Sequence, residues 1–454
     1  MRSEQNIINQ QYDAKMTLKY KGKIQDGNLE IGDWCIGKGD AKVTNLRFIE
    51  KLEITTLKLI ISNAIDLKVK NDTIIELIVK LVNRIDSFTI DDLKLQNLET
   101  LLFIDGNQLT NNQLYNLVKF KKLHTLDVSF NNVNLSNIHS VKCLTNLSMR
   151  QCGLTKIDQI TSLINLQELD LSANIDLDIC PLCKVTSLTK LKISDCNLKQ
   201  IDQIRSLTNL EVLDLSINKL VQIESIRYLV NVKELRISYN QKIDITPLQY
   251  LVGLIKLDVK NCGLKQLSAL KSLINLQALN VSFNYFLNIS ELQYLKNLTY
   301  LNLKQCNIVS IYVLKPLIKL ISLQISNNEI VYLDSNLNEM KQLEVLYVQF
   351  NRISDFTSLE KHQNRNNNGN ICFNIQNQRE PFKEELHYAN QMRDLEHPNI
   401  QLKDIQNKHK ILNTQLNACK LKISELPNQL HYNQMQLASS AVHLFQQLDQ
   451  LEFE

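Results

Sequence analysis

The fold is decided by Leu123-His-Thr-Leu126-Asp-Val128-Ser-Phe-Asn131-Asn-Val133, the clearest copy of a pattern, L-x-x-L-x-L-x-x-N-x-L, that restarts about every 22 residues. A fixed period of this length indicates a solenoid, because each repeat forms one coil that cannot bury its apolar face alone and stacks on its neighbours. The copies begin at Leu123, Leu144, Leu166, Leu188, Leu210, Val232, Leu254, Leu276, Leu298, Leu320 and Leu343.

Each copy predicts a short strand followed by a tighter turn. Apolar residues at the fourth and sixth positions alternate with polar ones, which is the period of a β-strand with one buried face. Further along, apolar residues recur at every third position, as in Leu198, Ile201, Ile204 and Leu207, and this spacing suits a 3₁₀ turn or a short helix. We therefore predict an α/β solenoid of horseshoe form, with a parallel sheet on the concave side and 3₁₀ or short-helix turns on the convex side.

The ninth position of each copy carries a side chain that we expect to face inward. Asparagine there can donate and accept hydrogen bonds, so it can satisfy backbone groups of the loop that leaves the strand. Cysteine is a weak donor that can take the same place. Frequent alternation of the two types suggests a double repeat of about 44 residues. The predicted structural ladder is Asn131, Cys152, Asn174, Cys196, Asn218, Asn240, Cys262, Asn284, Cys306, Asn328 and Asn351.

Regions of different pattern flank the repeats. Residues 1–45 contain two short alternating runs around Asp26-Gly27, which predict a β-hairpin, and we interpret this region as an N-terminal cap on the first coil. Residues 46–360 form the predicted solenoid, irregular to about residue 122 and regular from 123 to 360. Residues 361–380 are rich in asparagine and predict a linker.

Residues 381–454 predict an α-helical tail. Apolar residues recur with alternating spacings of three and four from Leu402 to Leu426, which is the pattern of a coiled-coil seam. A second apolar run, from Met435 to Leu448, can fold back on the first. Two interpretations stay open: an antiparallel hairpin that covers its own seam or the last coil, and self-association through residues 400–450.

The charge balance gives no sign of a nucleic-acid or membrane partner. The 454 residues include 51 basic and 47 acidic side chains, well mixed, for a formal net charge of +4. No window approaches the roughly 18 consecutive apolar residues of a membrane span, and the chain starts without an apolar leader. Ten cysteines without a paired framework indicate reduced thiols. We therefore expect a cytoplasmic or nuclear protein.

No catalytic or cofactor motif accompanies the repeats. The eight histidines lie mostly outside the regular array, and no Ser-His-Asp or Cys-His arrangement is suggested. Cys180-Pro-Leu-Cys183 has the spacing of a metal or redox pair, but no second pair at ligand spacing follows, so we interpret it as a turn. The sequence predicts a non-enzymatic protein without a metal or a cofactor.

The outward strand positions are the candidate binding surface. Their central column alternates in charge from Asp170 to Asp258, so it is either a self-neutralising ladder or a mixed-charge docking strip. The next column is largely serine, which we expect to let another backbone approach. Aromatic residues carry interface energy disproportionately, so we add several of them to the set. The predicted partner-binding residues are Asp170, Lys192, Asp214, Arg236, Asp258, Tyr239, Phe283, Tyr300 and Tyr347.

The full repeat frame, as in Leu210-x-x-Leu213-x-Leu215-x-x-Asn218-x-Leu220-x-x-Ile223-x-x-Ile226-x-x-Leu229, resembles the leucine-rich repeats of the protein phosphatase 1 regulatory subunit and of bacterial internalins. The resemblance covers about residues 120–360 and extends more weakly back to about residue 50. It implies a curved array that holds protein ligands on its concave face. We therefore expect an interaction scaffold for a protein partner. The alternatives are a regulatory subunit of a protein phosphatase 1-type catalytic subunit and an oligomerising protein that acts through its C-terminal helices.

Overall fold

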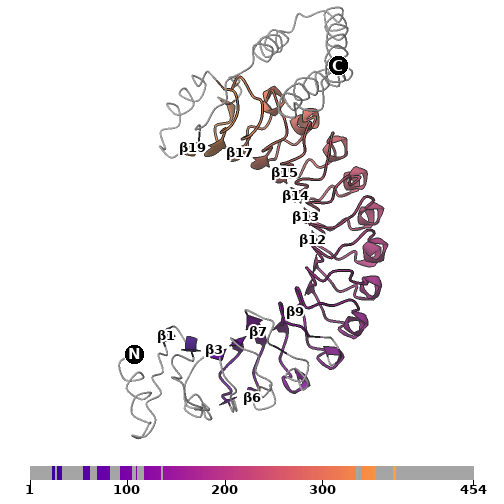
Figure 1. Ribbon diagram of the computed structural model, residues 1–454, viewed down its shortest axis with the longest axis vertical. Coiled ribbons are helices and arrows are strands. Elements are labelled where there is room, and N and C mark those ends of the chain that lie inside the picture. The colour runs from indigo at the N-terminus through magenta and orange to yellow at the C-terminus, as the bar shows by residue number, and fades with distance from the viewer. Residues whose placement is uncertain are drawn as a thin grey trace, which may run out of the picture. The chain divides into compact units, whose positions relative to one another are not determined.

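The computed structural model describes residues 23–25, 28–32, 55–61, 69–81, 93–104, 109, 117–133, 136, 138–333, 337, 339–353 and 372–374. The predicted helical tail, residues 381–454, and most of the predicted cap lie outside the described residues. The chain divides into two compact units, Met1–Lys219 and Leu220–Glu454. Within each unit, short strands lie side by side along one face and the 3₁₀ turns lie on the opposite side (Figure 1).

The first unit begins with a hairpin and longer strands. β1 (Lys23–Gln25) pairs antiparallel with β2 (Asn28–Gly32), and β2 pairs parallel with β3 (Thr56–Ile61). The later strands are β4 (Val69–Lys70), β5 (Glu76–Leu81), β6 (Leu93–Lys94), β7 (Thr100–Ile104), β8 (Thr125–Asp127), β9 (Asn146–Ser148), β10 (Glu168–Asp170), β11 (Lys190–Lys192) and β12 (Val212–Asp214). The 3₁₀ turns are η4 (Leu117–Lys119), η5 (Ile138–Ser140), η6 (Asp158–Ser162), η7 (Cys180–Lys184) and η8 (Asp202–Ser206).

The second unit continues the same pattern. Its strands are β13 (Glu234–Arg236), β14 (Lys256–Asp258), β15 (Ala278–Asn280), β16 (Tyr300–Asn302), β17 (Ser322–Gln324), β18 (Val345–Tyr347) and β19 (Cys372–Asn374). Its 3₁₀ turns are η9 (Glu224–Tyr228), η10 (Thr246–Tyr250), η11 (Ser268–Leu270), η12 (Ser290–Tyr294) and η13 (Tyr312–Leu314). β19 lies in the segment for which we expected a linker, and it pairs parallel with β18.

The register of the strands places equivalent residues of successive coils beside each other. Leu169 of β10 pairs with Leu147 of β9 and with Leu191 of β11, and all three leucines are buried. In the early coils, Leu57 and Leu77 are partners in the same way, although the spacing of the repeats there is uneven. Because alternate side chains of a strand point to opposite faces, one register buries the whole row of fourth-position leucines.

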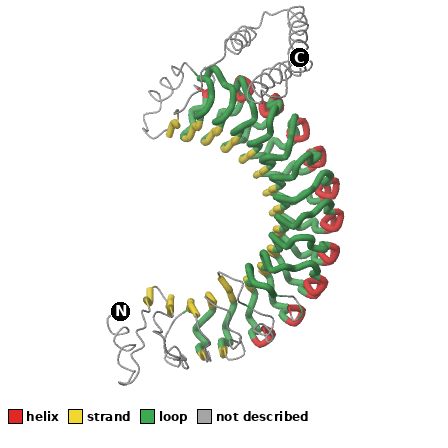
Figure 2. The backbone as a smooth tube through the Cα atoms, viewed as in Figure 1, coloured by secondary structure: helices red, strands yellow, loops and turns green. Residues whose placement is uncertain are grey.

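The spacing of three on the other side of each coil produces 3₁₀ turns. In η8, Ile204 is buried and the N–H of Leu207 donates to its carbonyl at 2.9 Å. Side chains three residues apart eclipse in a 3₁₀ turn, so Ile201, Ile204 and Leu207 all face the interior and none is more than 1% exposed. Figure 2 shows these turns in red opposite the yellow strands of each unit. The fold is thus a solenoid with a parallel sheet and 3₁₀ turns, as the sequence predicts.

Among the described residues, no helix combines the length and the apolar character that a membrane crossing requires.

Candidate functional site

Asparagine at the ninth position of a coil lies inside and bonds to backbone groups of two coils. The Nδ2 of Asn174 donates to the carbonyls of Met149 at 2.9 Å and Leu171 at 2.7 Å. Its Oδ1 accepts the N–H groups of Cys152 at 3.0 Å and Leu154 at 2.9 Å. One side chain therefore bonds to four buried backbone groups, and of these the carbonyl of Leu171 also accepts the thiol of Cys196. The same four contacts recur at Asn218, Asn284 and Asn328.

The other asparagines of the ladder make contacts of the same kinds. Each is buried, donates Nδ2 to the carbonyl three residues earlier and accepts an N–H from the preceding coil on Oδ1. These residues are Asn131, Asn240 and Asn351.

Cysteine at the ninth position replaces only the donor function of the amide. The Sγ of Cys196 donates to the carbonyl of Leu171 at 3.4 Å, which is the place that Nδ2 takes at an asparagine level. A thiol offers no equivalent of the amide oxygen, and the preceding loop has a different path. Asp176 adopts a φ of +57°, and its N–H donates to the backbone carbonyl of Cys196 at 3.2 Å. Lys242 bonds to the carbonyl of Cys262 in the same way, at 3.0 Å.

The ladder thiols are buried and stay protonated. Loss of solvation raises the pKa of Cys152 and Cys196 to about 11 and that of Cys262 and Cys306 to about 12. The thiolate is the nucleophile and the metal ligand, so these four thiols are unreactive at neutral pH. All four are free, and they occupy the structural positions of the coils.

Cys180 and Cys183 lie in η7 and are exposed and free. Asp178 accepts the N–H of Cys180 at 2.9 Å, and the hydrogen bond between the Asp178 side chain and the Cys180 thiol raises the pKa of the thiol. No group of three or more metal-binding side chains occurs among the described residues. The structure places Cys180-Pro-Leu-Cys183 in the 3₁₀ turn of its coil, which is the turn that we inferred from the sequence.

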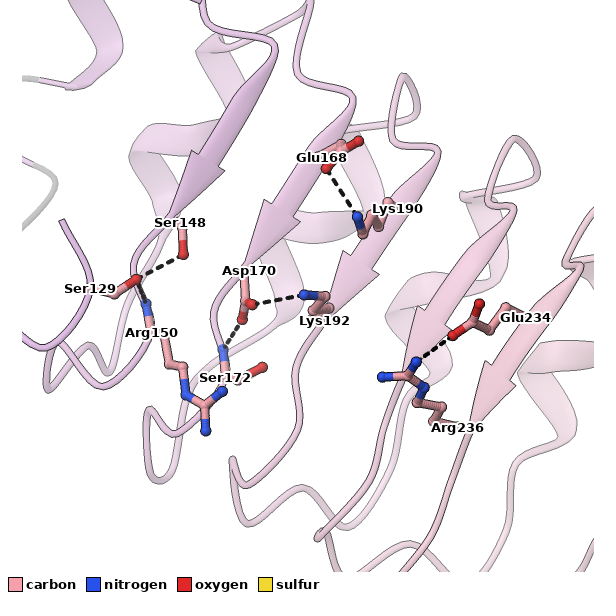
Figure 3. A network of polar contacts seen from close by, with 10 residues as sticks. All are labelled: Ser129, Ser148, Arg150, Glu168, Asp170, Ser172, Lys190, Lys192, Glu234 and Arg236. Carbon is pink, nitrogen blue, oxygen red and sulfur yellow. Dashed lines mark hydrogen bonds and ion pairs between the residues drawn. The ribbon is translucent and has the colours of Figure 1, made fainter. Parts of the chain in front are cut away.

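The strand face of each unit is the surface formed by the outward side chains of its strands. In the first unit, charges on this face pair between neighbouring coils (Figure 3). The Nζ of Lys192 lies 3.5 Å from Asp170, and the Nζ of Lys190 lies 3.3 Å from Glu168. The register Asp170 to Lys192 and Glu168 to Lys190 brings these pairs opposite each other. Asp214 follows Lys192 in the same row.

A hollow of about 200 Å³ lies on this strand face. It is lined by residues of β7 to β11, among them Asp127, Ser148, Asp170 and Lys192. Pockets for small molecules and cofactors usually measure about 300–1,000 Å³. A smaller hollow with charged walls fits one or two side chains of a protein partner.

In the second unit, one acidic residue forms ion pairs with two basic residues. Glu234 lies 2.6 Å from Arg236 on the same strand and 3.6 Å from Lys256 on the next strand. Arg236 is exposed, and Figure 3 shows its contact with Glu234. Asp258, the next predicted member of the column, pairs in register with Arg236. Burial raises the pKa of Asp258 above its ordinary value.

The outward column that contains Asp170 and Asp258 is the fifth position of each repeat, and we call it the fifth-position column. Its acidic and amide side chains also accept a hydrogen bond from the turn that follows the strand. Asp170 accepts the backbone N–H of Ser172 at 3.0 Å, and Asp258 accepts that of Lys260, also at 3.0 Å. Asn302 does the same for Lys304 at 3.0 Å. This local role explains why short carboxylates and amides recur at the position, independently of any partner.

The serine column differs from our expectation. We predicted that these small side chains would let another backbone approach, but most of them are buried, with Ser172 at 2% and Ser282 at 1% exposure. They follow the strand, in the turn, and the Oγ of Ser129 contacts the Oγ of Ser148 on the next strand at 2.7 Å. Of the serines in this column, Ser194 alone is half-buried, and the others are buried. The column is therefore part of the packing, and the partner cannot reach it along most of its length.

The two predicted aromatic residues that come just after a strand have a left-handed backbone. Tyr239 has a φ of +59° and Phe283 has a φ of +61°, and residues other than glycine rarely adopt such values. Tyr239 is 40% exposed, and Phe283 is half-buried. Tyr300 and Tyr347, the other predicted aromatic anchors, lie on β16 and β18 and are also half-buried. Four aromatic side chains are thus partly accessible on the strand side of the second unit.

The cations that lie beside aromatic rings on the strand side are not among the residues predicted from the sequence. Arg150 lies 5.8 Å from the ring centre of Phe130 in the first unit. In the second unit, Lys260 lies 4.8 Å from the ring centre of Phe283, and Lys304 lies 5.7 Å from it. The sequence did contain a sign of these cations, because Arg150, Lys260 and Lys304 occupy the position at which most repeats have a serine.

Comparison with known proteins agrees with this architecture. A family model described as leucine-rich repeats (2 copies) matches residues 186–228. The crystal structure of an internalin, InlF, from Listeria monocytogenes is similar at 26% identity and a TM-score of 0.54, over 63% of this chain and 82% of that one. The functional domain of InlJ from Listeria monocytogenes, which includes a cysteine ladder, is 21% identical over 75% of this chain and 72% of that one, with a TM-score of 0.48. No curated protein matches the chain.

The stacked coils, the buried ladder and the family match define a leucine-rich repeat protein. Its repeats are similar to those of the internalin InlF.

Proposed function

We propose that the protein is a non-enzymatic scaffold that binds a protein partner on the strand faces of its repeat array. Stacked repeats of this class create extended binding surfaces. The observation that carries the proposal is the segregation of side chains over successive coils. The inward positions are apolar or bonded to backbone and buried, whereas every predicted partner-binding residue, from Asp170 to Tyr347, retains accessible surface.

The accessible residues suit a protein better than a small molecule. The hollow in the first unit is small and has charged walls, and the second unit adds partly exposed aromatic rings. Aromatic and arginine side chains are the commonest hot spots of protein interfaces. Paired charges such as Asp170 with Lys192 contribute little affinity at a half-exposed surface, but they select a partner with the matching charge pattern.

Site-specific photo-crosslinking tests this proposal. A photoreactive phenylalanine analogue at Tyr300 reports on the strand face, and the same analogue at the exposed Tyr294 reports on the 3₁₀ side of the same unit. We expect one discrete crosslinked protein from Tyr300 and none from Tyr294 in extracts of the cells that make the protein. Equal crosslinking from both positions, or crosslinking from Tyr294 alone, contradicts the proposal.

A more specific partner is proposed from the repeat frame around Leu210–Leu229, which resembles that of the protein phosphatase 1 regulatory subunit. A protein phosphatase 1-type catalytic subunit is the partner that this resemblance predicts. Co-purification with that subunit, lost when the charges of Asp214 and Arg236 are reversed together, supports this alternative. A pull-down without phosphatase contradicts it.

Two further proposals concern the molecule as a whole. We propose a reducing compartment, cytoplasmic or nuclear, which is supported by the free thiols of the described residues. Self-association through residues 400–450 is supported by the heptad spacing in the sequence. Sedimentation of the full chain and of a truncation at residue 360 distinguishes the scaffold from the oligomerising alternative, which requires that only the full chain self-associates.

A further inference from the structure

Lysines and aromatic rings alternate over four successive coils of the second unit. The Nζ of Lys260 lies 5.1 Å from the ring centre of Tyr239 and 4.8 Å from that of Phe283. The Nζ of Lys304 lies 5.7 Å from the ring centre of Phe283. We call these four residues the lysine–aromatic stripe. Each lysine takes the position at which most other coils have a serine.

The backbone holds the stripe in place. The N–H of Tyr239 donates to the carbonyl of Lys260 at 2.8 Å, and the N–H of Phe283 donates to the carbonyl of Lys304 at 2.8 Å. Each ring is therefore fixed beside the lysine of the next coil. The left-handed φ of both aromatic residues is part of this arrangement and costs free energy that the surrounding coils must offset.

The positive charge of the stripe is not neutralised by an ion pair. Among the described residues, no carboxylate lies within ion-pair distance of Lys260 or Lys304, whereas Glu234 holds both Arg236 and Lys256. Asp258 influences Lys260 through space, but its oxygen accepts the backbone N–H of that residue. The lysines lie over aromatic faces instead, which leaves their ammonium groups open to a partner's anion.

We propose that the lysine–aromatic stripe docks an extended acidic segment of the protein partner, which deepens the proposed function and rests on it. Strands of a sheet are about 4.8 Å apart, so the two lysines, two coils apart, are separated by roughly 10 Å. An extended peptide in the polyproline II conformation rises about 3.1 Å per residue with three residues per turn, so carboxylates three residues apart lie on one face and match this separation. An apolar residue between them lies against Phe283.

A nucleic acid fits the stripe less well. Binding of a single strand combines stacked aromatic residues with a positively charged groove that follows the phosphates. Here two lysines stand in a chain of mixed charge with a net charge of +4. A peptide with two carboxylates matches that local charge without further basic residues.

Fluorescence anisotropy with the full chain tests the inference. The probe is a fluorescein-labelled peptide in which Glu-Ala-Phe is repeated four times, and its control has glutamine in place of glutamate. The test variant carries Lys260→Gln and Lys304→Gln. The matched control is Lys271→Gln, because Lys271 lies 4.6 Å from the ring centre of Tyr294 on the 3₁₀ side of the same unit.

We expect the glutamate peptide to bind at least tenfold more tightly than the glutamine peptide. The double variant should lose about tenfold in affinity, and Lys271→Gln should change it less than twofold. Absence of peptide binding, an equal loss for Lys271→Gln, or tighter binding of an oligothymidylate probe overturns the inference. If Tyr300 still crosslinks a partner equally well in the double variant, the scaffold function stands and the stripe alone is excluded from it.

Discussion

Two polar columns repeat through each unit with the same period, and they are held in opposite ways. The ninth-position column is buried, and its members bond to backbone groups, as Asn284 does with four of them. The fifth-position column is outside, and its members bond to the following turn or to a neighbouring side chain, as Asp170 does. Water can replace a lost partner only outside. The inner column therefore determines stability, and the outer column is free to determine recognition.

The largest effect expected from this difference is that of Asn284→Ala. The substitution leaves the N–H groups of Cys262 and Leu264 and the carbonyl of Val259 without their amide partner, whereas the carbonyl of Val281 keeps the thiol of Cys306. Each buried unsatisfied group costs roughly 1–3 kcal/mol, so we expect the free energy of unfolding to fall by about 4 kcal/mol. Urea denaturation followed by far-UV circular dichroism measures it.

The matched outer substitution is Lys256→Ala, which removes a contact of 3.6 Å with Glu234 in the same unit. Exposed ion pairs contribute about 0.2–1 kcal/mol, so the free energy of unfolding should fall by less than about 1 kcal/mol. Similar losses for Asn284→Ala and Lys256→Ala would show that the two columns do not differ in the way that we infer.

Cys262→Asn disturbs the ninth-position column by adding a buried group instead of removing one. The repeat pattern alone favours asparagine there, but the N–H of Lys242 already donates to the carbonyl of Cys262. The new amide oxygen would therefore be buried without this donor, and the larger side chain would crowd its neighbours. We expect a loss of about 2 kcal/mol in the free energy of unfolding, larger than that of Cys262→Ala. An asparagine variant as stable as the native chain would contradict this account of the cysteine levels.

Alkaline pH tests the cysteine levels without a change of shape. Burial raises the pKa of Cys306 from 9.0 to about 12, so the stabilisation that its thiol provides is complete below pH 9 and is lost as the pH rises toward 12. One pH unit above the unfolded pKa corresponds to about 1.4 kcal/mol per thiol. Between pH 8 and pH 10, the native chain should lose about 1.4 kcal/mol more stability than Cys306→Ala. Equal losses in the two proteins would exclude the thiol as the cause.

The repeated burial pattern was enough to predict the solenoid from the sequence. Leu126, Ile204 and Asn174 each stand for a position that recurs in many coils, and repetition averages out the local exceptions. The strands, the 3₁₀ turns and the asparagine and cysteine positions all follow from such columns. These are also the positions at which burial leaves few alternatives for a side chain.

The candidate site was less predictable because it depends on the exceptions. The left-handed backbone at Tyr239 and Phe283 turns the rings toward the next coil, and no periodic pattern encodes that angle. The pairing of Lys190 with Glu168 depends on which rotamers two long side chains adopt. The burial of the serine column likewise follows from the turn after each strand, which the alternation of a strand does not predict.

The smallest expected effect is that of a substitution in the fifth-position column, and it raises the free energy of unfolding instead of lowering it. Burial raises the pKa of Asp258, so its charged form opposes folding at neutral pH, and stability increases as the pH falls through that raised pKa. Asn280 and Asn302 occupy the same position in the next coils, where their amide oxygens accept the N–H groups of Ser282 and Lys304. Asp258→Asn should therefore keep the turn and raise the free energy of unfolding at pH 7 by roughly 0.5 kcal/mol. The gain should disappear in acid, where the native carboxyl is also neutral, and a gain that persists there would mean that the charge is not its source.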